Sequence, residues 1–208
     1  MKRPHSTLRQ FPRNRLLRSG ALLLAAVASL PGRADAQGEG PFIQLEPRAM
    51  ARVVYFSQTG LAGEYAIEYG KPAWRSDYDA AFEKLTRGQR MRLGRDWWTT
   101  LNTFCALKFG DKAELKPGDY FLALECSEKG DWSLIALDPE PLRKSKVDAF
   151  GTAQTKGGTK IPLHYATTDD AVKELSIAFV ADPASTKQQT LEIRFGKHRL
   201  TTVVKPTL

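Results

Sequence analysis

Apolar and polar residues alternate along most of the chain after residue 48, and this alternation is the pattern of half-buried β-strands. It is clearest where Tyr65, Ile67 and Tyr69 share one face of a short segment. The same criteria predict strands at residues 52–58, 64–69, 98–109, 113–115, 120–126, 131–137, 161–167, 174–180, 190–195 and 199–204. Many short strands separated by turn signals predict a mainly β fold, a single antiparallel β-sandwich of jelly-roll or Ig-like type.

One short helix is predicted near residues 76–87. Tyr78 and Phe82 are spaced at i and i+4, so they fall on the same helix face. Ser76 followed by Asp79 resembles a capping box in which Asp replaces the usual Glu. This element leads directly into the segment that is richest in candidate chemistry.

Two connections are predicted from turn residues. Residues 139–160 are polar and contain several glycines, so a long loop is expected there. Gly196-Lys197-His198 fits a tight hairpin turn between the last two predicted strands.

The first 36 residues resemble a secretory signal peptide. Basic residues precede an apolar run at residues 20–30, which is too short to span a bilayer as a helix. Ala34-Asp35-Ala36 then supplies the small-x-small pattern that signal peptidase reads. An uncleaved anchor or a buried core helix are the alternatives. The prediction is export to the periplasm or the exterior, a flexible leader at 37–47 and one domain at 48–208, with no membrane span after cleavage.

Export changes the interpretation of the charge. The whole chain has a formal net charge of +8, but seven of its 31 basic residues and one of its 23 acidic residues lie in positions 1–36. The remaining 24 basic and 22 acidic residues give a net charge of +2. A nucleic-acid partner therefore loses its compositional support, and none is predicted.

The two cysteines predict a disulfide. In an oxidising compartment an even number of cysteines is most simply paired. Cys105 is in phase with buried-type residues of one predicted strand, and Cys126 is in phase with those of another. The alternative is a pair of buried free thiols.

Arginine and tryptophan gather at residues 87–100, the strongest candidate for a binding site. Arginine offers a rigid fork of donors for a carboxylate or phosphate, and tryptophan offers a flat apolar face. The candidate ligand-binding residues are Arg90, Arg92, Arg95, Asp96, Trp97, Trp98, Thr99 and Thr100. The alternative is a structural lock, in which arginine stacks on tryptophan and pairs with Asp96 or Glu83.

Other chemistry finds little support in the sequence. His164 and His198 are isolated from each other and from other ligand types, so no metal site is predicted. There is no Gly-x-Ser-x-Gly nucleophile elbow, and the carboxylates are scattered. No catalytic residue and no cofactor are predicted.

Four motifs occur in an order that resembles the exported bacterial family known as domain of unknown function 2911. They lie at residues 67–72, 90–100, 115–120 and 131–135. The resemblance implies an exported β-sandwich-like domain without an assigned activity. The residues that match its central motif are Arg92, Gly94, Thr99 and Thr100, whereas Met91, Arg95, Asp96 and Phe195 depart from the family pattern.

The leading functional hypothesis is an exported, non-catalytic binding module for a small anionic or glycan-like ligand. The first alternative is a hydrolase-type enzyme whose residues converge around Arg92. A pocket that holds Arg92 beside a carboxylate or His164 would favour it. The second alternative is an envelope-associated interaction protein, which predicts an uncovered apolar patch or an open sheet edge.

Overall fold

A computed structural model describes residues 47–208 of the protein. The predicted signal peptide at 1–36 lies outside the described residues, as does the predicted leader at 37–47 apart from Pro47. No helix in the described part of the chain is long and apolar enough to cross a membrane.

The described chain is mainly β, as the alternation predicts. Its strands are β1 (Ala49–Ser57), β2 (Gly60–Tyr69), β3 (Gln89–Arg92), β4 (Thr99–Thr103), β5 (Ala106–Phe109), β6 (Ala113–Leu115), β7 (Gly118–Cys126), β8 (Trp132–Leu137), β9 (Thr159–Asp182) and β10 (Ser185–Thr207). Its helices are α1 (Asp77–Thr86), α2 (Pro139–Lys144) and the short 3-10 helix η1 (Ala149–Gln154). The helix α1 confirms the prediction near 76–87.

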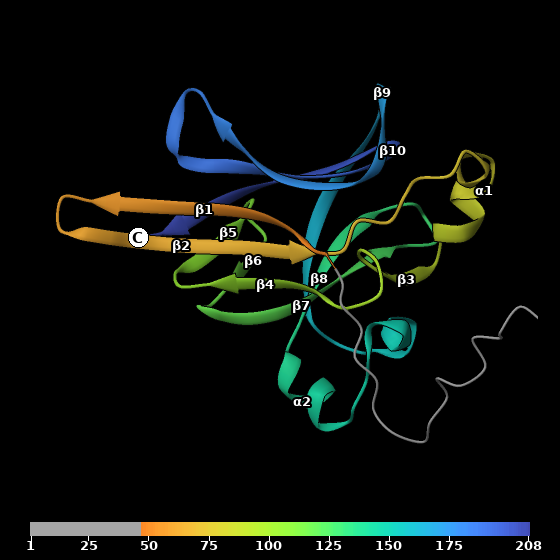
Figure 1. Ribbon diagram of the computed structural model, residues 1–208, viewed down its shortest axis with the longest axis horizontal. Coiled ribbons are helices and arrows are strands. Elements are labelled where there is room, and N and C mark those ends of the chain that lie inside the picture. The colour runs from red at the N-terminus through yellow and green to blue at the C-terminus, as the bar shows by residue number, and fades with distance from the viewer. Residues whose placement is uncertain (1–46) are drawn as a thin grey trace, which may run out of the picture. The chain divides into compact units, whose positions relative to one another are not determined.

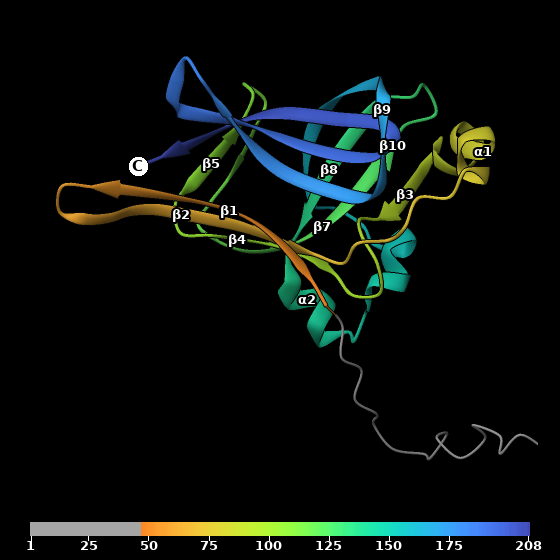
Figure 2. The same ribbon diagram turned by 45° about the horizontal axis from the view of Figure 1, so that its top comes forward.

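The strands form one antiparallel, hydrogen-bonded path that folds into two layers. Its order is β1-β2-β4-β7-β8-β9-β10-β5-β6, and β3 also pairs with β7. β9 pairs with β8 over residues 159–163 and with β10 from His164 onwards, so it carries the path from one layer into the other. The curved β9 and β10 pass over β1, β2 and β4 (Figures 1 and 2). The fold is sandwich-like but open, because β1 and β6 remain edges.

The last strands are longer than predicted. Residues 161–167 and 174–180 belong to the single strand β9, and the predicted hairpin at Gly196-Lys197-His198 is wrong, because β10 runs through it. The β9–β10 register shifts between Arg194 and Gly196 and again between Gly196 and His198. Gly196 has a φ of +51°. The turn-forming residue therefore makes a bulge inside a strand.

The predicted loop at residues 139–160 is partly helical. Asp138 caps α2 by accepting a hydrogen bond from the Glu140 N–H at 2.9 Å, and Asp148 caps η1 in the same way from the Phe150 N–H at 2.9 Å. Capped helical turns are stable even when short if they pack on apolar surface. These two cover the outer face of β7 and β8, where Phe121 and Ile135 are buried.

The main core lies between the two layers. It is built from the inward faces that alternation predicts, including Tyr65, Ile67, Leu101, Leu107 and Leu122, each no more than 1% exposed. β8 is buried along its whole length, because the core covers one face and α2 with η1 covers the other. The packing therefore fixes the strands from which the candidate site is built.

The predicted disulfide is wrong: Cys105 and Cys126 are both free and buried. Thr103, two residues before Cys105, pairs with Gly118 at the start of β7, whereas Cys126 ends that strand. The eight steps along the strand from Gly118 to Cys126 span roughly 26 Å of extended chain, far more than the roughly 7 Å that a bridge tolerates between Cα atoms. Both cysteines share the alternation of the core, but Cys105 lies beside the start of β7, whereas Cys126 lies at its end.

Candidate functional site

Arg90, in β3, is a structural residue. Its guanidinium group contacts the Glu125 carboxylate at 2.8 Å and donates to the carbonyl oxygens of Thr155 at 3.0 Å and Gly157 at 3.1 Å. Lys160 pairs with the same carboxylate at 2.5 Å. Hydrogen bonding from Lys160, and then from Arg90, lowers the pKa of Glu125. Arg90 therefore joins β3 and β7 to the segment between η1 and β9, and it has little freedom to bind a ligand.

The bend after β3 exposes three of the predicted residues. Arg95 pairs with its neighbour Asp96 at 2.8 Å, and both are partly accessible to solvent. Asp96 adopts a φ of +58°, which suits a tight bend. Trp97 is 64% exposed, so its ring is available as a stacking surface. This group is a surface feature rather than part of a cavity.

The next residues are packed within the fold, by contacts other than the arginine–tryptophan stacking of the alternative hypothesis. Trp98 is buried and stacks on Phe121, with ring centroids 4.9 Å apart and planes inclined by 2°. Its indole N–H donates to the Val147 carbonyl at 3.4 Å. Thr99 is fully buried and donates to the Leu93 carbonyl at 2.5 Å. Thr100 is half-buried within β4.

Arg92 differs from the other arginines in the segment. Its guanidinium carbon lies 4.4 Å from the Phe150 ring centroid, and the group donates to the Asp96 carbonyl oxygen at 3.4 Å. It makes no ion pair with a carboxylate among residues 47–208. Arg92 also lines a cavity between α1 and the sheet. Arg92 is therefore a cation without a carboxylate partner among residues 47–208; the residue borders the cavity, while its guanidinium group rests on Phe150, which is not part of the lining.

The cavity has a volume of about 210 Å³ and a mainly aromatic and aliphatic lining. Besides Arg92 and Thr86, the lining residues are Trp74, Tyr78, Phe82, Leu85, Met91, Leu124, Trp132, Phe195, His198 and Leu200. No carboxylate is among these residues, and His164 is not among them either. An apolar cavity with one unpaired cation suits a ligand that has an apolar body and an anionic end.

Aromatic stacking holds α1 over the sheet. Phe82 of α1 lies on the His198 ring of β10, with centroids 3.5 Å apart and planes inclined by 6°. Trp74, just before the helix, lies edge-on to Tyr78 at 5.4 Å. The Trp74 indole also rests against Gly196, where an added Cβ would overlap it. These contacts form one wall of the cavity.

Backbone hydrogen bonds to β9 hold the chain segment that leads into α1. The Trp74 N–H donates to the Lys173 carbonyl at 2.7 Å, and the Leu175 N–H donates to the Pro72 carbonyl at 3.0 Å. The predicted capping box is wrong, because the Ser76 side chain makes no cap hydrogen bond. The bonds to β9 fix where the helix begins.

His198 is the buried titratable group of the cavity. Its Nδ1 lies 2.8 Å from the Tyr165 hydroxyl, and its Nε2 lies 3.4 Å from an Asp79 carboxylate oxygen without forming a hydrogen bond. Burial lowers the pKa of His198 because it disfavours the charged ring, and the Asp79 carboxylate opposes this effect in part. The ring is therefore held in its neutral form at neutral pH.

Sequence reasoning identified Arg92 but missed the aromatic residues around it. The spacing of Tyr78 and Phe82 indicated their shared face, whereas Trp74 and Trp132 gave no signal of a common site. The sequence places His198 in a predicted turn and shows it isolated as a metal ligand, so it gives no signal of this cavity. The topology brings these residues together, because α1 packs on the bulged part of β10.

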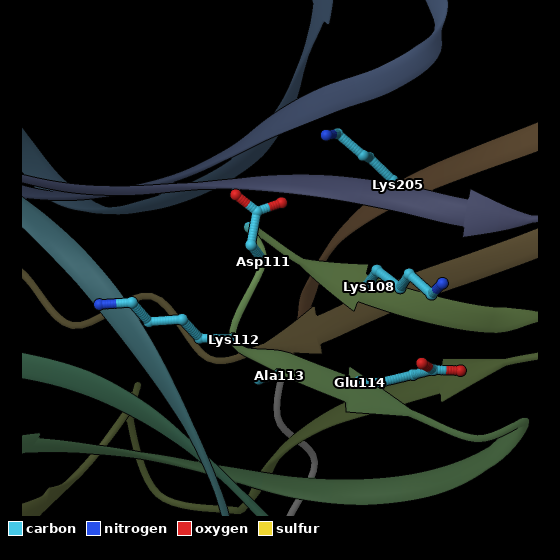
Figure 3. A pocket seen from close by; sticks show the side chains of 7 residues that line it. Lys108, Asp111, Lys112, Ala113, Glu114 and Lys205 are labelled. Atoms are coloured by element: carbon cyan, nitrogen blue, oxygen red, sulfur yellow. The ribbon is translucent and has the colours of Figure 1, made fainter.

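A second hollow, of about 490 Å³, lies over β5, β6 and the end of β10. Figure 3 shows that the ammonium groups of Lys108, Lys112 and Lys205 do not converge on one point. Lys108 faces Glu114 across the β5–β6 pair. This is a solvated charged surface without convergent groups.

In the described part of the chain, no three His, Cys, Asp or Glu side chains are grouped closely enough to hold a metal ion. Comparisons with protein-family models, curated proteins and solved structures found no match to this chain. The likeness to domain of unknown function 2911 therefore stays a prediction from the sequence motifs.

Gly94 provides a test of the structural role of the bend. Its φ is +96°, and a Cβ at this position would lie 2.8 Å from the Thr99 hydroxyl and 3.1 Å from the Gly70 carbonyl oxygen. We expect Gly94→Ala to lower the free energy of unfolding by about 2–4 kcal/mol, from backbone strain plus overpacking. Gly110, with φ +54° and no atom within 4 Å, is the matched control and should lose only about 1 kcal/mol. Equal losses in urea denaturation would contradict the packed bend.

The lowered pKa of His198 predicts a pH dependence of stability. As the pH falls through about 6.5, the unfolded chain takes up a proton at this residue before the folded chain does. The neutral His198 ring therefore makes its full contribution to the free energy of unfolding above that pH. This contribution is lost as the pH falls towards the pKa of His198 in the folded protein. We expect the Tm to fall over this range, and to fall less in His198→Phe, which keeps a ring beside Phe82. If the Tm of both proteins fell equally with pH, His198 would not be the source of the pH dependence.

Proposed function

We propose that this chain is an exported, non-catalytic binding protein, periplasmic or secreted, whose cavity beneath α1 takes a small organic anion. The observation that carries the proposal is the position of Arg92. It lines an apolar cavity and has no carboxylate partner in residues 47–208. A guanidinium group without a carboxylate partner can pair with an anion, and charge-assisted hydrogen bonds are stronger than neutral ones.

The lining supports the size and character of the ligand. An apolar cavity of roughly 150 Å³ accommodates benzene, so a cavity of about 210 Å³ suits one ring with a short acidic arm. Trp74, Phe82 and Trp132 supply aromatic surface for such a ring. A glycan is supported less, because it needs many polar partners and the lining has few. The exposed Trp97 is the feature that favours a glycan.

The absence of a carboxylate from the lining favours binding over hydrolysis. A hydrolase-type site needs an acid, a base or a nucleophile that converges on the substrate. Of the lining residues, the neutral His198 is a candidate general base, but its Nδ1 already contacts the Tyr165 hydroxyl and its Nε2 faces Asp79, and neither of these residues lines the cavity. The Thr86 hydroxyl already donates to the Phe82 carbonyl at 2.8 Å. The residues present support recognition of charge and shape.

Binding is tested with benzoate, phenylacetate and indole-3-acetate, each compared with its neutral amide, by tryptophan fluorescence and thermal shift. We expect at least one acid to bind more tightly than its amide. Arg92→Gln should lower the affinity for that acid by about tenfold or more and leave the affinity for its amide unchanged. Arg95→Gln is the matched control, because Arg95 is exposed and paired with Asp96, and it should bind like the wild type.

Two results would contradict the proposal. One is equal affinity for acids and amides in the wild type. The other is an equal loss of affinity in Arg92→Gln and Arg95→Gln. Inorganic phosphate serves as a further probe, and tight phosphate binding without organic-acid binding would show that the apolar lining plays no part.

A further inference from the structure

β1 is a long free edge of the sheet. It pairs with β2 along nine residues, and no strand within residues 47–208 pairs with its other side. The opposite edge, β6, has only three residues. β9 and β10 cover the inner face of β1, where the Gln189 amide donates to the Tyr55 hydroxyl. Within residues 47–208, no strand covers the outer face or the hydrogen-bonding edge of β1.

The sequence of β1 lacks most of the features that keep a free edge from associating. Such edges usually carry lysines, prolines or several charges. Ala49–Ser57 contains no Pro, Gly, Lys, Asp or Glu, and Arg52 is its only charged residue. Met50, Val54 and Phe56 alternate on the outer face and are 52%, 38% and 78% exposed. The strand is therefore both unpaired and apolar.

The apolar surface continues beyond β1. Leu61 lies opposite Phe56 in the β1–β2 hairpin and is 57% exposed. Phe104, whose backbone N–H donates to the Glu64 carbonyl, is 67% exposed. The β1–β2 hairpin extends away from α1, at the opposite end of the sheet (Figure 1). A partner here would leave the cavity beneath α1 open, and several exposed apolar side chains at one sheet edge favour an interaction surface.

We propose that β1 pairs antiparallel with β1 of a second copy of this chain, centred on Val53. In this register Met50 faces Phe56 of the second copy, and a thioether beside an aromatic ring is a favourable contact. Ala51 faces Tyr55, so a small residue meets a large one. Arg52 faces Val54 of the second copy, so the two arginines, the only charged residues of the paired strands, do not lie opposite each other. The resulting two-fold contact is isologous and closed.

The register gives a test at position 54. Val54→Lys places a lysine opposite Arg52 of the second copy, whereas Val54→Glu places a carboxylate there. Within one chain, position 54 faces Glu64. The lysine variant should therefore stabilise the monomer but weaken the dimer, and the glutamate variant should do the reverse. A general folding defect cannot produce this pattern.

Sedimentation velocity over a series of protein concentrations measures the association, and urea denaturation measures folding. We expect the wild type to dimerise, Val54→Lys to raise the dimer Kd by about tenfold, and Val54→Glu to keep or tighten the dimer. Val180→Lys, which changes a residue of β9 that is 46% exposed, is the matched control and should dimerise like the wild type.

Three outcomes would overturn the proposal. The first is a wild-type protein that stays monomeric at every concentration. The second is equal weakening of the dimer by Val54→Lys and Val54→Glu. The third is a monomer that floats with phosphatidylglycerol vesicles, which would identify a lipid surface, and not a second copy, as the occupant.

Discussion

The bulged segment of β10 around Gly196 is the constraint on which the candidate site depends. A regular strand would continue the ladder with β9 at a constant register, but two shifts occur between Arg194 and His198. The Trp74 indole rests directly on Gly196, and any larger residue would displace it. The Phe82 ring then lies flat on His198. Without this irregularity, α1 would have no matching surface on the sheet.

The electrostatics of the cavity follow from that packing. Burial keeps His198 neutral, and the carboxylate that approaches it, Asp79, is not part of the lining. The other arginines of the 87–100 segment are paired elsewhere, Arg87 with Glu83, Arg90 with Glu125 and Arg95 with Asp96. Arg92, which lines the cavity, is left without a carboxylate partner in residues 47–208, and its guanidinium group rests on the Phe150 ring. One segment therefore contains both residues that hold the fold and the residue on which the proposed binding depends.

Much of the fold could be predicted from the sequence, because alternation reports which face of a strand is buried. The inward positions of Tyr65, Ile67 and Leu101 and the helix α1 follow from residue spacing alone. The continuity of β10 could not be predicted, because a glycine that permits positive φ serves a bulge as well as a turn. The disulfide prediction was wrong for a related reason. Alternation gives the face of a residue but not its position along the strand, and Cys105 and Cys126 lie far apart.

The candidate site was predictable only in part. Arginine density identified the segment that contains Arg92, but the same density includes residues that hold the fold, such as Arg90 and Trp98. The cavity itself depends on contacts between α1 and β10, which are distant in the sequence. Local patterns carry no information about such contacts. The open edge at β1, by contrast, matches what an interaction protein would present.

The most direct test of the central claim uses the four tryptophans as reporters. Each gives one indole N–H resonance in the NMR spectrum of isotope-labelled protein, and phenylacetate is added as the probe. If the cavity beneath α1 is the binding site, the resonances of Trp74 and Trp132 shift while that of Trp98 stays in place. A shift of the exposed Trp97 alone, with Trp74 and Trp132 unchanged, would contradict this account.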